Sequence, residues 1–182
     1  MRITSGARIN MDVMAGVASE GVIRIGRYDA NTSRYNEIQN YVTSTGVGSY
    51  MNLSVHSGTE NVITDVMTLL GNGYVGIGTA SPEGKLHVYS GDASIAPNGD
   101  GDEFVIENSG NAGMSILTGN TSNGAIFFGD AQDNNVGIID YDHNINTMSF
   151  TTGASRAITI NASQNVGIGV TGPVGKFQVA LP

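Results

Sequence analysis

One glycine-rich segment of this sequence occurs twice. NGYVGIGTASPEGKLHV at residues 72–88 returns 91 residues later as SQNVGIGVTGPVGKFQV at residues 163–179, with Val, Gly, Ile, Gly, Pro, Gly and Lys in the same positions. The likeness extends upstream, because GVIRIGR at 21–27 matches GAIFFGD at 124–130. Repetition at such a period is typical of stacked units that cannot bury their apolar faces singly. We therefore expect two copies of one fold module, and not a duplicated catalytic pocket.

The spacing between matching segments falls along the chain. It is 103 residues at 21–27, 97 residues where YMNLSV at 50–55 matches TMSFTT at 147–152, and 91 residues at the glycine-rich segment. The second copy is therefore shorter by two six-residue deletions. A shared scaffold with shortened connecting loops explains this pattern.

The residue types favour an all-β fold. Val and Ile together number 33 against six Leu, and β-branched side chains suit a pleated surface better than a helix. Many of the 26 Gly lie beside Asn or Asp, a combination typical of tight turns. We expect short strands at 22–26, 36–42, 50–55, 66–70, 74–78 and 85–90 in the first copy, and at 103–108, 113–119, 125–130, 135–140, 147–152, 156–160, 165–169 and 175–180 in the second.

The organisation follows from these copies. Residues 1–20 are predicted to be an N-terminal attachment or pairing segment, and residues 21–90 the first module. The cluster GDASIAPNGDGD within residues 91–103 is predicted to be a linker, because Pro, Gly and Asp interrupt regular structure. Residues 104–182 then form the second module.

Charge and composition exclude several classes of protein. The net charge is −8 and the eight Lys and Arg are scattered singly, so nucleic-acid binding is disfavoured. No apolar run of about 18 residues is present, so we expect no membrane insertion. Cysteine is absent, which excludes disulfides. We expect the protein to be made in a cytoplasm.

Short strands with few large apolar residues would leave open edges and an underfilled core in a single chain. Identical chains around a shared axis would satisfy both, so we infer an elongated, intertwined homotrimeric β-fibre. Glycine permits close backbone approach and a central isoleucine fills the interior. The residues predicted to line the trimer axis are Gly76, Ile77, Gly78, Gly167, Ile168 and Gly169.

Other candidate chemistry is weak. Asp140, Asp142 and His143 offer a cation site or an acid–base pair, but a polar turn is the simpler interpretation. The carboxylates of residues 100–103 have the oxygen-rich character of a calcium loop without its full twelve-position pattern. Tyrosines such as Tyr41 present either a sugar-stacking face or half-buried strand residues, and the absence of Trp favours the latter. We predict no catalytic residue, no metal and no cofactor.

The ordered string FFGD, NNVGIIDYDH, MSFTTG, ITI, NVGIG and GKFQV resembles the repeat module of bacteriophage tail-fibre and related virion fibre proteins. The resemblance covers residues 112–179 closely, and residues 21–90 resemble a variant of the same module. It implies a trimeric, elongated, β-rich protein. Many such fibres end in a self-cleaving chaperone domain, whose Ser-Asp start and Arg-Leu-Lys run are not found after the last repeat here.

These observations predict a non-enzymatic structural fibre protein of a bacteriophage virion, tail- or baseplate-associated, that contributes to host-cell adsorption. Its expected partners are two further copies, other virion proteins, and a host surface polysaccharide or receptor. Two alternatives remain: a carbohydrate-degrading tailspike with an intersubunit site, and a bacterial surface adhesin built from the same module. Host contact is expected in the loops at 30–34, 43–49, 57–61 and 131–135.

Overall fold

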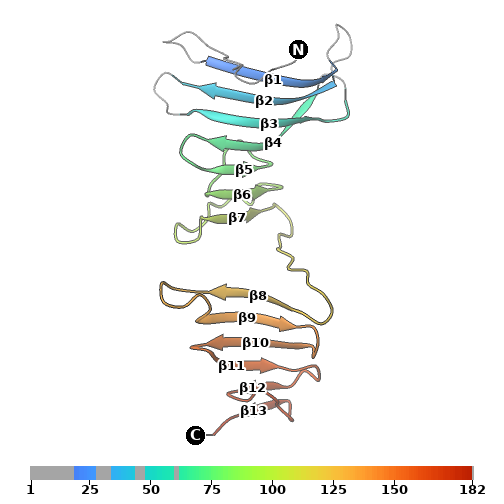
Figure 1. Ribbon diagram of the computed structural model, residues 1–182, viewed down its shortest axis with the longest axis vertical. Coiled ribbons are helices and arrows are strands. Elements are labelled where there is room, and N and C mark those ends of the chain that lie inside the picture. The colour runs from blue at the N-terminus through green and yellow to red at the C-terminus, as the bar shows by residue number, and fades with distance from the viewer. Residues whose placement is uncertain (1–18, 28–33, 44–47, 60–61, 182) are drawn as a thin grey trace, which may run out of the picture. The chain divides into compact units, whose positions relative to one another are not determined.

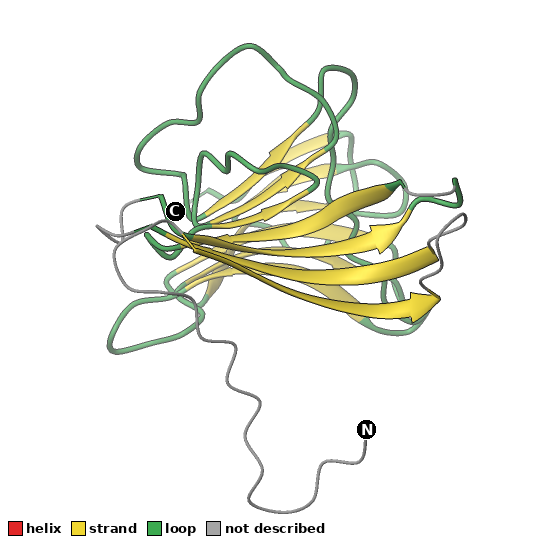
Figure 2. Ribbon diagram, turned by 90° about the horizontal axis from the view of Figure 1, so that it is seen from above, coloured by secondary structure: helices red, strands yellow, loops and turns green. Residues whose placement is uncertain are grey.

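The computed structural model describes residues 19–27, 34–43, 48–59 and 62–181. Within these ranges the chain consists of strands, turns and loops without a helix, so the expectation of an all-β fold is confirmed (Figure 2). Most of the predicted N-terminal segment lies outside the described residues, as do most of the host-contact loops at 30–34 and 43–49 and the last two residues of the loop at 57–61. The chain divides into two units, residues 1–113 and 114–182.

The first unit contains one mixed sheet whose strands lie side by side in chain order (Figure 1). Neighbouring strands are antiparallel from the first to the fifth, and the last two are added in parallel. The strands are β1 (Ser19–Arg27), β2 (Arg34–Val42), β3 (Tyr50–His56), β4 (Ile63–Leu70), β5 (Val75–Ile77), β6 (Leu86–Tyr89) and β7 (Phe104–Glu107).

The second unit repeats the first six of these strands. Its sheet also runs in chain order, with four antiparallel pairings followed by one parallel pairing. Even the irregularities match, because the register shifts after Leu53 in the first sheet and after the equivalent Phe150 in the second. The strands are β8 (Asn123–Phe128), β9 (Gly137–Asp142), β10 (Thr147–Thr152), β11 (Ser155–Ile160), β12 (Val166–Ile168) and β13 (Phe177–Val179).

Two segments differ from the sequence-based expectation. Residue 104 was expected to open the second module, but β7 pairs in parallel with β6 and belongs to the first sheet. Phe104 and Ile106 lie opposite Leu86 and Val88 there, so they lengthen the apolar rows of that sheet. Residues 113–119 were expected to form a strand but form none.

Each sheet has one apolar face. Because strand side chains alternate between faces, the pairing register identifies the residues that lie in line across a sheet. In the first unit one such row is Ile23, Ile38, Leu53, Met67, Ile77, Val88 and Ile106. In the second unit the equivalent row is Ile126, Ile139, Phe150, Ile158, Ile168 and Val179.

The opposite face of each sheet is polar and better covered. Ser149 and Thr159 are almost completely buried there, as are Thr68 and His87 in the first unit. Among the described residues, the buried ones are polar or charged, or are Gly or Pro. No hydrophobic side chain of these residues is buried. In the part of the chain that the structure describes, the usual arrangement of an apolar core beneath a polar surface is therefore missing.

Candidate functional surfaces

Within the described residues, most of the apolar face of each unit is uncovered. A second row lies beside the first, formed by Met51, Leu69, Val75, Leu86 and Phe104 in the first unit and by Tyr141, Met148, Ile160, Val166 and Phe177 in the second. Ile168 is 41% exposed, and Phe104 and Phe177 are more exposed still. Contiguous apolar surface of this kind marks an interaction site on a soluble protein.

The residues predicted to line a trimer axis fall on different sides of their sheets. Ile77 and Ile168 occupy equivalent positions in the apolar rows, where a neighbouring chain can reach them. Gly76 and Gly167 are one residue earlier and therefore face the polar side. The axial position of Ile77 and Ile168 stays a prediction.

The glycines of the two GIG motifs have a role inside the chain. A Cβ on Gly76 would lie 2.3 Å from the carbonyl oxygen of Thr79, and a Cβ on Gly167 would lie 2.3 Å from that of Val170. Gly78 and Gly169 adopt positive φ values of 77° and 66°, a conformation that favours glycine. These glycines let the chain turn back tightly over its own strand before it forms the parallel strand that follows.

A side chain from that parallel strand fastens the crossover loop in both units. His87 Nδ1 accepts a hydrogen bond of 3.2 Å from the backbone N–H of Glu83. At the equivalent place in the second unit, Gln178 Oε1 accepts one of 3.0 Å from the N–H of Val174. The shared geometry indicates that position 87 has a structural role.

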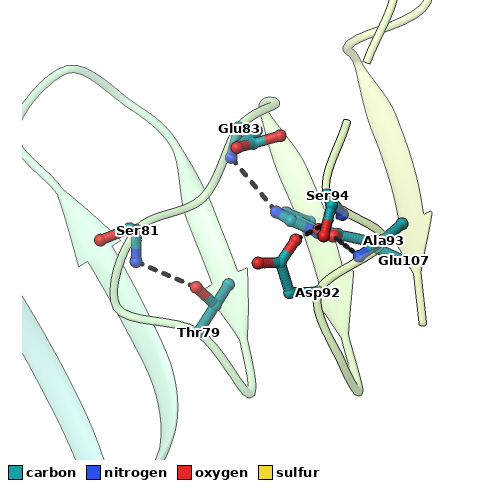
Figure 3. A network of polar contacts seen from close by, with 8 residues as sticks. Thr79, Ser81, Glu83, Asp92, Ala93, Ser94 and Glu107 are labelled. Carbon is teal, nitrogen blue, oxygen red and sulfur yellow. Dashed lines mark hydrogen bonds and ion pairs between the residues drawn. The ribbon is translucent and has the colours of Figure 1, made fainter. Parts of the chain in front are cut away.

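His87 also faces an acidic side chain. Its Nε2 lies 3.0 Å from Glu107 Oε2, although the contact does not meet the angular requirements of a hydrogen bond. Glu107 Oε1 accepts a hydrogen bond from the backbone N–H of Ala93, and Asp92 accepts one from Ser94 (Figure 3). A cavity of about 410 Å³ lies beside these groups. Because only 1% of His87 is exposed, the histidine–glutamate pair is better suited to holding a loop in place than to binding a substrate.

Exchange of His87 tests this interpretation. We expect His87→Gln to leave stability nearly unchanged, because a glutamine amide can accept from Glu83 N–H as Gln178 does from Val174. His87→Ala should cost about 2 kcal/mol, since it opens a cavity and removes the acceptor of the Glu83 N–H. Chemical denaturation of both variants measures the difference. Equal losses in the two variants would contradict the structural role.

The candidate acid–base residues make separate local contacts. The buried Asp140 accepts a hydrogen bond of 2.5 Å from Ser149 Oγ and lies 3.9 Å from Arg156 Nη2. Asp142 caps a turn by accepting from the N–H of Asn144, and the His143 ring packs edge-on against Tyr141. No group of three potential metal-ligating side chains occurs among the described residues.

The other candidate chemistry also has a structural explanation. The carbonyl oxygens of Asp102 and Glu103 accept hydrogen bonds from the N–H groups of Lys85 and Leu86, and Asp100 takes part in a turn through its N–H. Tyr41 and Tyr50 stack on one another across β2 and β3, with ring centroids 5.1 Å apart. Both tyrosines are half-buried. Tyr41 is therefore a half-buried strand residue, which is the role that the absence of Trp favours.

The loop between β8 and β9 is held by one carboxylate. Asp130 Oδ1 accepts hydrogen bonds from the backbone N–H groups of Gln132 and Asp133, at 2.8 and 2.9 Å. These bonds lower the pKa of Asp130 below its ordinary value of 3.8. This is the one proposed host-contact loop, residues 131–135, that the structure describes in full, and its backbone is ordered by its own residues.

The sign of the resulting pH effect follows from that lowered pKa. The ionised carboxylate is favoured in the folded state, so its contribution to stability is present above the unfolded value near 3.8 and is lost as pH falls through the folded pKa. A carboxyl-carbon NMR titration should place the midpoint of Asp130 below 3.8. Asp130→Asn should abolish this part of the acid dependence, and a midpoint at or above the ordinary value would contradict the loop geometry.

The sequence matches no protein-family model, and no curated protein matches it. The described part of the chain also contains no helix that is long and apolar enough to cross a membrane.

Proposed function

We propose that this chain is a structural, non-enzymatic fibre protein of a bacteriophage virion that assembles as a homotrimer, associates with the tail or baseplate and contributes to host-cell adsorption. The observation that carries the proposal is the open apolar face of both units. A single-layer sheet with continuous apolar rows needs a second layer. Further copies of the same chain can supply that layer with a matching surface.

Three copies are favoured by a combination of arguments. The sheets of three chains can enclose one axis with their apolar rows, so that each chain contributes one wall of a shared core. The resemblance of residues 112–179 to virion fibre modules implies the same number. The repeated crossover loops then lie on the outer, polar side, where they stiffen each wall.

A structural role is also favoured by what the polar groups do. Buried polar side chains such as Asp140 and His87 are engaged with neighbouring loops and strands. The carbohydrate-degrading tailspike would need two carboxylates facing one another across a groove between subunits. The adhesin alternative uses the same trimeric scaffold in a different biological setting.

The solution mass tests the assembly. Light scattering with sedimentation should give three times the 18.9 kDa of one chain, with a high frictional ratio. A compact monomer would contradict the shared core, and a dimer would replace the three-walled arrangement with a sandwich of two sheets.

A second measurement tests the biological setting. Mass spectrometry of purified virions encoded by the same genome should detect the chain among the tail or baseplate proteins. Loss of a host polysaccharide on incubation with the trimer would favour the tailspike. Genes for secretion beside the coding sequence, in place of virion genes, would favour the adhesin.

A further inference from the structure

The outer edge of β13 differs from the equivalent edge in the first unit. β6 and β13 are both sixth strands of their module and both pair in parallel with the strand before them. In the first unit β7 covers the other edge of β6. Within the residues that the structure describes, no strand pairs with the other edge of β13.

The bonds that hold β7 show what this edge can bind. The backbone N–H groups of β6 and its flanks donate to carbonyl oxygens of β7 and its flanks. The bonds run from Lys85 to Asp102 at 2.8 Å, from Leu86 to Glu103 at 3.0 Å and from Ser90 to Glu107 at 2.9 Å. The equivalent donors in the second unit, Lys176, Phe177 and Leu181, make no such bond within the described chain. An open strand edge is a template for another strand.

A retained glycine is an independent sign that this edge can take a further strand. A Cβ on Gly84 would lie 2.1 Å from the carbonyl oxygen of Asp102 and 2.8 Å from Val105, so glycine is needed there to admit β7. Gly175 is the equivalent residue in the repeat, and a Cβ there would meet nothing within 4 Å. Neither glycine has a positive φ. Gly175 therefore keeps open a space that nothing in the described chain fills.

Exposure agrees with this comparison. Leu86, which β7 flanks, is 36% exposed, whereas the equivalent Phe177 is 66% exposed. Val179 is exposed as well, whereas the equivalent Val88 is only partly exposed. Two apolar side chains thus lie uncovered beside an unpaired backbone edge.

We propose that the outer edge of β13 binds an additional parallel β-strand from a polypeptide segment with the chemistry of β7. Such a segment carries apolar side chains at its first and third positions, as Phe104 and Ile106 do, to extend the apolar rows beyond Phe177 and Val179. Its carbonyl oxygens accept from the free N–H groups of the edge. This site is independent of the number of chains in the assembly, because in the first unit the strand comes from the same chain.

A graft in the full chain tests the site. Residues 91–109, the connection and β7, are added after Leu181 in place of Pro182, which is the position that follows β6 in the first unit. We expect hydrogen exchange of the backbone amides of Phe177 and Leu181 to slow at least about tenfold, because the added strand protects them. Unchanged exchange at both amides would overturn the proposal.

Two matched variants of the grafted chain make the test specific. Gly175→Val should return exchange to the rate of the chain without the graft, since its side chain occupies the space where the strand approaches. Gly172→Val, at another open glycine of the same loop, should leave the protection intact. Equal protection in both variants would overturn the assigned edge. Exchange in β11, measured in parallel, reports whether Gly175→Val keeps the fold.

Discussion

Ile168→Asp is expected to prevent assembly of the trimer. Ile168 lies near the end of the continuous apolar row of the second unit, between Ile158 and Val179, and it is 41% exposed within one chain. In the proposed trimer the substitution would place three carboxylates around one axis. Removing them from water without a partner costs several kcal/mol for each ion. We expect sedimentation to show monomers in place of trimers.

Val174→Asp is the matched control for this variant. Val174 is also an apolar residue of the second unit, but it lies in the crossover loop and is 89% exposed. The Val174→Asp substitution introduces the same charge outside the apolar rows, so it should leave the trimer intact. A trimer of normal mass for Ile168→Asp would show that the apolar row does not face the axis. Loss of the trimer in both variants would assign the effect to added charge alone.

The strands were largely predictable from sequence because their side chains alternate and the module occurs twice. The repeat also predicted an underfilled core, which corresponds to the open apolar faces. Residues 113–119 show the limit of alternation. Met114, Ser115 and Ile116 alternate in polarity, but Leu117 interrupts the alternation, and no strand forms.

The shortening of the second copy is distributed differently from the expectation. The first six-residue deletion is divided between two connections, the one before β2 and the one after it. The offsets between equivalent residues of the apolar rows show this division. Ile23 and Ile126 are 103 residues apart, Ile38 and Ile139 are 101 apart, and Leu53 and Phe150 are 97 apart. Counted between equivalent residues, the second copy is two residues shorter between its first and second strands and four residues shorter between its second and third. Matching of short motifs could not resolve this division, since no recognisable motif covers β2 and β9.

The glycines of the candidate axis were predicted to admit a neighbouring chain, but the sequence did not reveal what approaches them. A glycine that admits a neighbouring chain and one that admits its own chain look alike in a motif. The carbonyl oxygens of Thr79 and Val170 supply an intrachain reason for Gly76 and Gly167. In the same way, β7 was assigned to the second copy because the sequence did not reveal which sheet it joins.

Gly167→Ala is expected to be the most destabilising single-methyl change in the second unit. The added Cβ would lie 2.3 Å from the carbonyl oxygen of Val170 and close to the Val170 side chain. The crossover loop must move away, which disturbs the hydrogen bonds that tie β12 to β13, including the bond from Ala180 N–H to the Ile168 carbonyl. Overpacking against backbone costs about 3 kcal/mol.

Gly172→Ala separates this steric effect from the general effect of replacing glycine. Gly172 lies in the same crossover loop, and an added Cβ there meets nothing within 4 Å. Its φ is not positive, so alanine should be neutral or slightly stabilising because it restricts the unfolded chain. Denaturant unfolding of both variants measures the difference. If the Gly167→Ala and Gly172→Ala variants are equally stable, the loop can shift at little cost. The close approach over Gly167 would then not determine how the chain returns into β13.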